Sequence, residues 1–249
     1  MRPKGRGTRL DVALVEAGLA GSRGQAQALI VAGKVRVGGE TVRAPDRAVA
    51  TGASLELVSP PRYVSRGGEK LAPALDEFGV VVEGRVCADV GASTGGFTDV
   101  LLQRGAARVY AVDVGRGLLH WRLRQNPRVV PMERVNARYL ESFPEPVSLV
   151  TVDVSFIALE KVLPALRRAA PGAELVVLFK PQFQVGRSEV GKGGIVRDEG
   201  AVRAALERFR SWCEGAGIRV LAQTWSALPG ADGNREVLLH LAAEAEAPG

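Results

Sequence analysis

The chain has 249 residues, of which 46% are apolar and 24% are charged. This length and composition allow a sizeable buried core and exclude a disordered chain, a collagen and a minimal disulfide scaffold. With two cysteines, two histidines and no CxxC spacing, neither a disulfide framework nor a zinc site fits, so we expect no bound metal and a cytoplasmic protein. No apolar run approaches the roughly 18 residues needed to cross a bilayer, so we expect no membrane partner.

The net charge of +6 is concentrated in the first quarter of the chain. Residues 1–66 hold 11 Lys and Arg against 5 Asp and Glu, whereas the remaining residues hold 22 of each kind. A basic N-terminal unit joined to an electrically neutral body predicts a module that binds a polyanion, attached to a domain that does another job.

The first 58 residues predict a small α+β domain. Apolar positions Leu10, Leu14 and Val15 recur at helical spacing, and a second helix is predicted from Ser22 to Ala32, with the serine as its cap. The segment KVRV, a glycine pair and ETVR then indicate a β-hairpin, and residues 54–58 alternate like a third strand.

The segment SPPRYVSRGGEK, from Ser59 to Lys70, marks a domain boundary. Its two prolines and its glycine pair interrupt both strand and helix patterns. We therefore expect a first domain over residues 1–58, a linker over 59–66 and a larger domain over 67–249.

The larger domain contains seven candidate strands, most of them separated by helical stretches. Runs such as LVTV and ELVVLF lack strict alternation, which is typical of central parallel strands buried on both faces. No helical pattern joins the last two strands, so an antiparallel return is predicted there. The predicted class is α/β, with the doubly wound, Rossmann-like sheet of a methyltransferase. The seven strands are predicted at residues 85–90, 108–112, 128–131, 148–152, 174–179, 218–224 and 236–241.

The segment CADVGASTGGFTDVLL indicates a ligand loop, because a strand ends there and a run of small residues leads into a helix. Its glycines let the backbone bend and approach a ligand, Ser93 and Thr94 supply hydroxyls, and the helix start supplies free N–H groups. The glycine spacing, at Gly91, Gly95 and Gly96, differs from the G-x-G-x-x-G dinucleotide fingerprint. A pyrophosphate-binding loop is therefore the weaker alternative.

Three polar side chains follow predicted strands on the cofactor side. Asp89 could receive the ammonium group of a cofactor. Asp113 ends the second strand, where an acid can accept hydrogen bonds from both hydroxyls of an adenosine ribose. Asn136 follows the third strand and could reach the adenine edge, with a turn-forming role as the open alternative.

Asp153 and Lys180 follow two further buried strands, where α/β folds of this kind keep their chemistry. The chain has 27 arginines and only 6 lysines. A lysine at the end of an apolar strand therefore predicts a group whose pKa can be lowered, which arginine cannot supply.

The segment RLDVALVEAGLAGSRGQAQALIVAGKVRVGGETV, residues 9–42, resembles the alpha-L RNA-binding motif. This motif occurs in a small-subunit ribosomal protein, pseudouridine synthases and some tRNA synthetases. Basic side chains at the end of a helix and on a hairpin suit a folded RNA backbone. The RNA-contacting residues that the resemblance implies, together with an arginine of the linker motif, are Arg9, Arg23, Gln27, Lys34, Arg36 and Arg66.

From about Arg9 to Leu241 the chain resembles the TlyA-type haemolysin A family of ribosomal-RNA 2′-O-methyltransferases, whose catalytic domain is FtsJ-like. The motifs that carry the resemblance are YVSRGGEKL, DVGASTGGFTDVLL, DVSFI, KPQFQVG with GKGGIVRD, and ALPGADGNREVLLHL. The resemblance implies a catalytic set of Lys70, Asp153, Lys180 and Glu236. It also implies that S-adenosylmethionine binds Asp113 and the loop residues Gly91, Ala92, Ser93, Thr94, Gly95, Gly96 and Phe97. Three further residues complete the cofactor site that we predict, namely Asp89, Asn136 and Asp153.

We therefore expect an enzyme that methylates a cytidine ribose in 23S rRNA, or in 16S rRNA as in some members of the family. Its partner would be ribosomal RNA or a ribosomal subunit. In this reading Lys180 accepts the hydroxyl proton, with Asp153 orienting it. The sequence leaves open whether Lys180 or Lys70 is the base, because two lysines and two carboxylates titrate together. Two alternatives are a catalytically inactive RNA-binding or ribosome assembly factor on a methyltransferase scaffold, and a small-molecule methyltransferase with an incidental basic domain.

Overall fold

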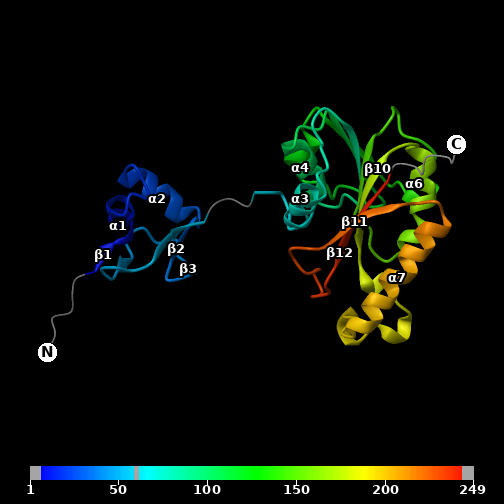
Figure 1. Ribbon diagram of the computed structural model, residues 1–249. Coiled ribbons are helices and arrows are strands. Elements are labelled where there is room, and N and C mark those ends of the chain that lie inside the picture. The colour runs from blue at the N-terminus through cyan, green and yellow to red at the C-terminus, as the bar shows by residue number, and fades with distance from the viewer. Residues whose placement is uncertain (1–6, 59–61, 243–249) are drawn as a thin grey trace. The chain divides into compact units, whose positions relative to one another are not determined.

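The computed structural model describes residues 7–58 and 62–242, which form two compact units (Figure 1). The first unit ends at Arg62 and the second begins at Tyr63. Residues 59–61 of the predicted linker lie outside the described residues. Residues 63–66 belong to the large unit, because Tyr63 is buried there and the Val64 N–H donates to Asp99 Oδ2 over 2.8 Å.

The small unit has the predicted α+β class. Its helices are α1 (Leu10–Glu16) and α2 (Arg23–Val31), and the side chain of Ser22 caps α2 by accepting a hydrogen bond from the Gln25 N–H. The hairpin of β2 (Val35–Val37) and β3 (Glu40–Thr41) is joined by β5 (Leu55–Leu57), as predicted. A further pair, β1 (Thr8–Arg9) with β4 (Ala48–Val49), was not predicted, because two-residue strands carry no periodic signal.

The large unit is built on a seven-stranded sheet with the order β11-β12-β10-β9-β6-β7-β8. Strand β12 is antiparallel to both neighbours and the other pairs are parallel, which confirms the predicted class and the antiparallel return. The predicted strand limits agree with the structure to within two residues. The strands are β6 (Val86–Val90), β7 (Arg108–Asp113), β8 (Val129–Glu133), β9 (Leu149–Val152), β10 (Glu174–Phe179), β11 (Val220–Trp225) and β12 (Val237–Leu241).

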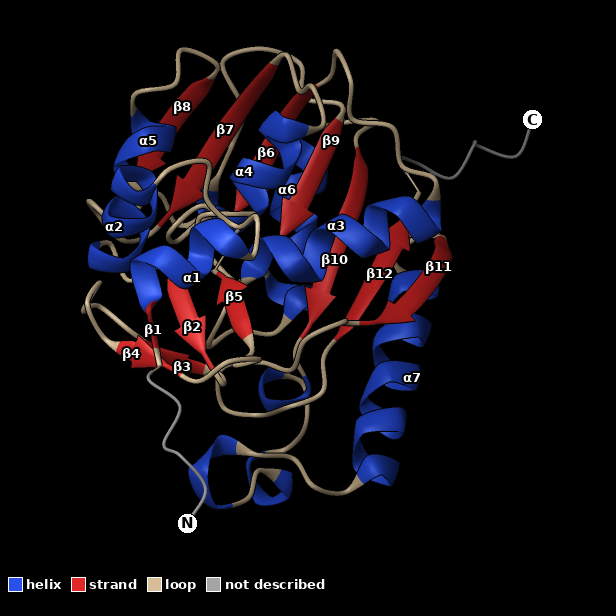
Figure 2. Ribbon diagram, turned by 90° about the vertical axis from the view of Figure 1, so that its left-hand side faces the viewer, coloured by secondary structure: helices blue, strands red, loops and turns tan. Residues whose placement is uncertain are grey.

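Helices cover both faces of this sheet (Figure 2). Helices α3 (Gly67–Phe78) and α4 (Gly96–Gln103) share one apolar core with one face, and α6 (Leu163–Ala169) and α7 (Glu199–Gly215) share another with the opposite face. The short α5 (Trp121–Arg124) leads into β8. Single 3₁₀ turns complete the connections, at Ala137–Tyr139, Leu159–Lys161, Pro181–Phe183, Arg187–Glu189 and Lys192–Gly194.

Burial on both faces explains why the central strands are almost purely apolar. Every residue of β9 and β12 is buried, and so is all but the first residue of β6 and of β10. Charged and polar residues are consequently confined mainly to the two ends of these strands. In the part of the chain that the structure describes, no helix is long and apolar enough to cross a membrane.

Candidate active site

The loop between β6 and α4 approaches its neighbours so closely that two of its glycines are required. Gly91 has a φ of +83°, and a Cβ there would lie 2.4 Å from the carbonyl oxygen of Asp153. Gly95 has a φ of +97°, and its Cβ would lie 2.3 Å from Leu123 Cδ1. Any other residue would be strained and would displace the backbone. The glycines therefore bring the loop against the carboxyl end of β9, as a close approach to a ligand requires.

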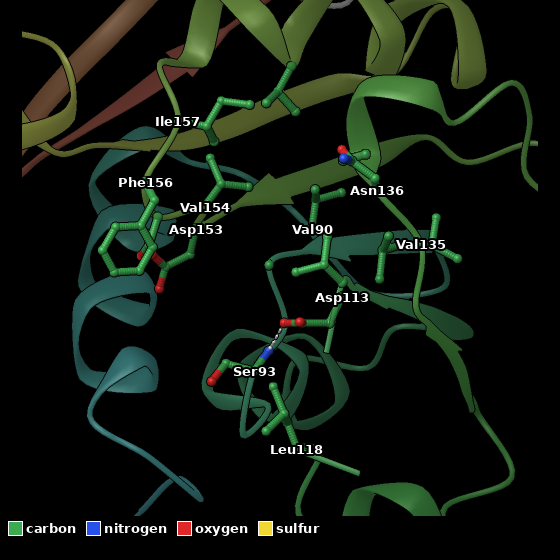
Figure 3. Close-up of a pocket in the computed structure, with 16 residues that line it drawn as sticks. Val90, Ser93, Asp113, Leu118, Val135, Asn136, Asp153, Val154, Phe156 and Ile157 are labelled. Carbon is green, nitrogen blue, oxygen red and sulfur yellow. Dashed lines mark hydrogen bonds between the residues drawn. The ribbon is translucent and has the colours of Figure 1, made fainter. Parts of the chain in front are cut away.

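A cavity of about 410 Å³ opens beside this loop, at the carboxyl ends of β6, β7 and β9 (Figure 3). Its walls are largely apolar, and its polar side chains include three of the predicted cofactor residues, Asp113, Asn136 and Asp153. Apolar walls with a few convergent polar groups are typical of a small-molecule site. The cavity, the close approach at Gly91 and the acid after β7 together fit an adenosine-containing methyl donor.

The two polar residues on the adenosine side are both held by the backbone. The carboxylate of Asp113 accepts hydrogen bonds from the Ser93 N–H over 2.8 Å and from the Gly115 N–H over 2.7 Å. Asn136 Oδ1 accepts from the Arg138 N–H, so this side chain forms the predicted turn and also lines the cavity. The turn-forming alternative for Asn136 is therefore confirmed, whereas the contact with an adenine edge, for which its amide nitrogen is available, stays a prediction.

A second, smaller cavity of about 180 Å³ adjoins the same loop. Gly91, Ser93 and Asp153 line both cavities, so the two spaces meet at these residues. Gly95 does not line either cavity, since it is buried against Leu119 and Leu123. The other predicted residues that line the smaller cavity are Arg66, Lys70, Asp89, Ala92, Thr94, Gly96 and Phe97.

Asp89 is fully buried at the floor of the smaller cavity, where it fixes the start of α4. One carboxylate oxygen accepts from the Thr98 N–H over 2.8 Å and from the Thr98 hydroxyl over 2.6 Å, and the other accepts from the Thr151 hydroxyl. Burial raises the pKa of Asp89 to about 7, and the nearby negative charge of Asp153 contributes in the same direction. A contact with a cofactor ammonium remains a prediction for this residue.

The four residues of the predicted catalytic set form two lysine–carboxylate pairs. Lys70 on α3 lies 2.5 Å from Glu236, which precedes β12, and both side chains are buried. Lys180, after β10, lies 2.5 Å from Asp153, after β9, and donates to the Ser155 hydroxyl over 2.9 Å. Segments that are remote in the sequence therefore meet at the carboxyl ends of the parallel strands.

The two pairs also act on each other electrostatically. The pKa of Glu236 is raised, and burial is the largest cause. The positive charges of Lys70 and then of Lys180 oppose this rise, whereas the negative charge of Asp153 adds to it. Asp153 Oδ1 is buried and, although close to the Lys180 amine, has no hydrogen bond of acceptable geometry. The ion pair with Lys180 therefore supplies the charge compensation of this oxygen.

In the small unit, three of the predicted RNA-contacting residues surround one buried acid. Asp11 accepts two hydrogen bonds from Arg9, one from Arg23 and one, over 2.8 Å, from the Gln27 amide. Arg9, followed by Gln27, holds the pKa of Asp11 well below its usual range. The sequence analysis missed Asp11, although an acid in the first turn of α1, within a basic segment, is the signal that could have indicated it.

The remaining predicted RNA contacts lie apart from Asp11. Lys34 and Arg36 are exposed, beside and on β2. Arg66 belongs to the large unit, where it donates to the Pro229 carbonyl over 3.0 Å and lines the smaller cavity. The structure therefore places Arg66 beside the catalytic pairs.

Phe156 is a second residue that the sequence analysis did not single out. Its side chain is 91% exposed, its φ is +64°, and its ring centroid lies 5.2 Å from that of Phe183. It lines the larger cavity, three residues after Asp153 (Figure 3). Its place in the DVSF motif was the available signal, because an exposed aromatic in a left-handed conformation is unfavourable without a function.

Comparison with known proteins places this site in a family. Residues 63–243 match the family described as FtsJ-like methyltransferase, and residues 8–55 match the S4 domain. The chain is 48% identical to the 16S/23S rRNA (cytidine-2′-O)-methyltransferase TlyA of Mycobacterium tuberculosis, over 95% of this chain and 90% of the relative. It is 42% identical to Hemolysin A of Brachyspira hyodysenteriae, over 93% of this chain and 98% of the relative.

A solved structure agrees with these matches. A protein from Streptococcus thermophilus, provisionally titled a hemolysin, aligns with a TM-score of 0.73 and 42% identity, over 98% of this chain and 90% of that one. The FtsJ-like match makes the large unit a methyltransferase domain that uses S-adenosylmethionine, which confirms the predicted cofactor. The chain therefore belongs to the FtsJ-like methyltransferases, and among them to the relatives of TlyA and Hemolysin A that carry an S4 domain.

Proposed function

We propose that this protein transfers a methyl group from S-adenosylmethionine to the 2′-hydroxyl of a cytidine in ribosomal RNA, in the cytoplasm. The observation that carries the proposal is the pair of lysine–carboxylate contacts beside the donor cavity, with Asp153 lining both cavities. The name of the relative from Mycobacterium tuberculosis, a 16S/23S rRNA (cytidine-2′-O)-methyltransferase, supports the substrate.

The donor side of the site is served by Asp113, Asn136 and the glycine loop. Asp113 would bind the ribose hydroxyls of the donor, and the Asn136 amide would bind the adenine edge. S-adenosylmethionine supplies an electrophilic methyl group on a sulfonium sulfur. Asp153 and Asp89 place negative charge beside the smaller cavity, where they favour this cation and its ammonium group.

The target ribose would lie beside the part of the smaller cavity that Lys70 and Asp153 line, while the part that Asp89 lines receives the donor's ammonium group. A ribose hydroxyl is a weak nucleophile, so a base has to accept its proton as it attacks. Lys180, as the uncharged amine, would accept this proton from the hydroxyl, and bound S-adenosylmethionine would supply the methyl group. Asp153 orients the amine, and Lys70, held by Glu236, fixes the hydroxyl in line with the methyl group.

The small unit would supply affinity for structured RNA. Lys34 and Arg36 are exposed, and Arg9 and Arg23 are partly exposed around Asp11. Such cations bind phosphates without reading the base, so the small unit positions the substrate and the large unit selects the hydroxyl.

Methylation of purified ribosomal subunits tests this function. Large and small subunits from cells that lack this protein are incubated with methyl-labelled S-adenosylmethionine and the full chain, and the rRNA is digested to nucleosides. We expect the label in 2′-O-methylcytidine, chiefly from 23S rRNA. Label on a base would contradict the proposed target. An absence of label, together with undetectable S-adenosylmethionine binding, would favour an inactive assembly factor.

A further inference from the structure

Residues 114–124, between β7 and the end of α5, form a corner with an exposed apolar surface. Val114, Leu118 and Trp121 are all exposed, and the Trp121 side chain is 64% exposed. The indole stacks on His120, with ring centroids 5.9 Å apart and an interplanar angle of 29°. A group of exposed apolar side chains at one corner is typical of a surface that binds a partner.

The same corner is strongly basic. Residues 114–132 contain four arginines and no acid. The nearest following acid, Glu133, already accepts hydrogen bonds from Arg124 and from the Gly117 N–H. Among the described residues, the guanidinium groups of Arg116 and Arg122 make no hydrogen bond or ion pair, and both residues are exposed. Arg124 is the main cause of the lowered pKa of Glu133, to which the positive charge of Arg116 contributes only weakly. The corner therefore presents two guanidinium groups without an ion pair beside an exposed indole.

The corner is also anchored to the methyl-donor loop. The His120 N–H donates to the Thr94 carbonyl over 3.1 Å, and Leu119 and Leu123 fill the space above Gly95. Leu118 lines the donor cavity (Figure 3). The exposed surface is thus continuous with the wall of the active site and is held in place relative to the donor.

We propose that this corner is a second RNA-contacting surface, on which an unpaired nucleotide of the substrate stacks against Trp121 while neighbouring phosphates pair with Arg116 and Arg122. Arginines without an ion pair beside an exposed indole match the two faces of a nucleotide, its charged phosphate and its flat base. A protein partner would have to place an acidic side chain opposite each cation, whereas RNA carries a phosphate at every nucleotide. The inference rests on the proposed function, because it assigns this surface to the same RNA substrate.

Steady-state methylation of ribosomal subunits by Trp121→Ala tests the stacking contact. We expect KM for the RNA to rise about tenfold, the cost of losing one base–aromatic stack, with unchanged kcat and unchanged S-adenosylmethionine affinity. Trp121→Phe should restore most of the affinity. The matched control is Trp225→Ala, which removes another exposed tryptophan from the other edge of the sheet and should leave KM unchanged.

The salt dependence of RNA binding tests the two cations. For Arg116→Ala combined with Arg122→Ala, we expect the slope of log K against log salt to become shallower by about 1.5 to 2. Arg203→Ala, which removes an exposed arginine from α7, should leave the slope unchanged. A merely structural role for the corner would change thermal stability and not this slope.

The outcomes separate this inference from the proposed function. If wild-type protein methylates 2′-hydroxyls while the Trp121 and arginine variants keep the wild-type KM and slope, the RNA surface is wrong and the proposed function stands. If the wild-type protein does not methylate RNA, the proposed function fails and this inference fails with it. Concentration-dependent self-association that is lost in Trp121→Ala, with unchanged RNA binding, would identify a second copy of the chain as the occupant.

Discussion

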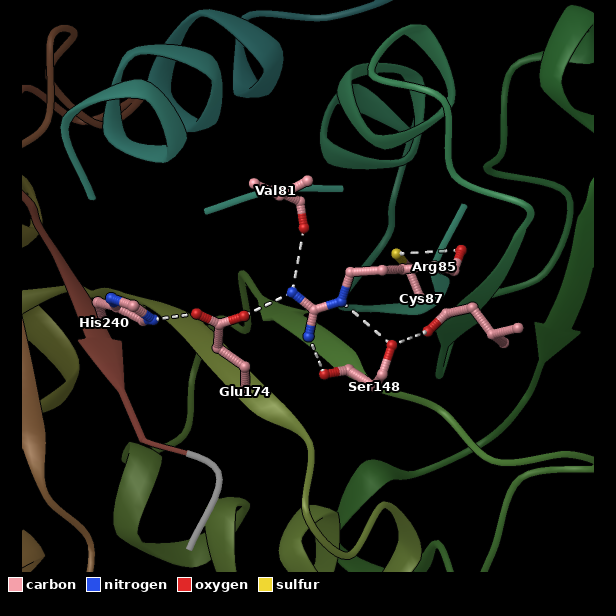
Figure 4. A network of polar contacts seen from close by, with 7 residues as sticks. Val81, Arg85, Cys87, Ser148, Glu174 and His240 are labelled. Atoms are coloured by element: carbon pink, nitrogen blue, oxygen red, sulfur yellow. Dashed lines mark hydrogen bonds and ion pairs between the residues drawn. The ribbon is translucent and has the colours of Figure 1, made fainter. Parts of the chain in front are cut away.

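The central strands β6, β9, β10 and β12 carry a polar cluster at each of their two ends, and the clusters differ in one respect. At the amino ends of the parallel strands lies a closed network, formed by Arg85, Ser148, Glu174 and His240 (Figure 4). At the carboxyl ends lies the candidate active site, formed by Asp89, Asp153, Lys180 and Glu236 with Lys70. Because β12 runs antiparallel, it contributes its last residues to the first cluster and its start to the second.

The amino-end network is satisfied by the protein itself. Arg85 donates to the Ser148 hydroxyl and the Val81 carbonyl, and it pairs with Glu174 at 2.5 Å. His240 Nε2 lies 2.5 Å from the other Glu174 oxygen, and its ring stacks on Phe78. This arrangement links four strands, and its residues line neither cavity of the candidate site, as a structural network requires.

The carboxyl-end cluster is left open on one side. It borders two cavities, and Asp153 Oδ1 lacks a hydrogen bond of acceptable geometry. The comparison teaches that one set of strands can serve stability at one end and chemistry at the other. The difference lies in the space beside the charged groups, because both ends pair their charges within the chain but, among the described residues, only the carboxyl end borders cavities that a ligand could fill.

The largest expected effect comes from Lys180→Ala at the open end. We expect kcat to fall by at least about 10³-fold, because the amine that accepts the hydroxyl proton is lost. Lys180→Arg should be equally inactive, since a guanidinium remains protonated. S-adenosylmethionine binding, measured by calorimetry, should be retained in both variants. Wild-type rates in a folded Lys180→Ala would remove this residue from the mechanism.

Glu174→Gln should break the closed end without affecting catalysis. The neighbouring His240, followed by Arg85, lowers the pKa of Glu174 to about 2, so the ionised form is stabilised by folding. We expect the free energy of unfolding to fall by about 2 kcal/mol at pH 7, with kcat unchanged. Tryptophan fluorescence measures this loss, because all three tryptophans lie in the large unit.

The pH dependence of that loss has a definite sign. Glu174 stabilises the fold above its ordinary pKa of about 4.5, and this contribution disappears as the pH falls towards 2. The difference between wild type and Glu174→Gln should therefore shrink on acidification. Arg203→Ala, which breaks an exposed helical pair, should cost less than about 0.5 kcal/mol. A Glu174→Gln protein as stable as wild type at pH 7 would contradict the structural role of the network.

Asp89 gives a smaller effect, which is seen in cofactor binding. Its raised pKa of about 7 means that the carboxylate is largely protonated at pH 5.5 and half ionised at pH 7. If it binds the donor's ammonium group, S-adenosylmethionine affinity should rise about tenfold over this range, and Asp89→Asn should show no such rise. The same raised pKa predicts that the Asp89 contribution to stability falls as the pH rises from about 4 to 7. Equal pH dependence in both proteins would exclude the ammonium contact.

Asp11 in the small unit shares a feature with each of the two clusters. Like the closed network, its carboxylate is fully hydrogen-bonded, and like the open cluster it leaves groups, here Arg9 and Arg23, partly exposed to a ligand. Asp11→Asn should weaken RNA binding a few-fold, since Arg9 and Arg23 lose the charge that orients them. A filter-binding titration measures this change. If the Asp11→Asn protein regains the wild-type RNA affinity when the temperature is lowered, Asp11 acts only on folding.

The sequence alone determined the strands of the large sheet and the chemistry of their ends. Unbroken apolar runs identified the central strands to within two residues, because burial on both faces leaves no room for polar side chains. The glycines after β6, and the motifs that contain Asp153 and Lys180, identified the methyltransferase family, since they are local patterns with a local physical cause.

Only the tertiary structure decided which charges meet. Lys70 and Glu236 are separated by 166 positions, and Arg85 and Glu174 by 89, yet the sheet order places each pair in contact. No local preference encodes such pairs. The same holds for the Asp11 cluster, where one buried carboxylate on α1 gathers side chains from α2 and from Arg9 on β1. A residue's type sets what it can do, whereas the packing of strands and helices sets which partners it has and whether a cavity remains beside them.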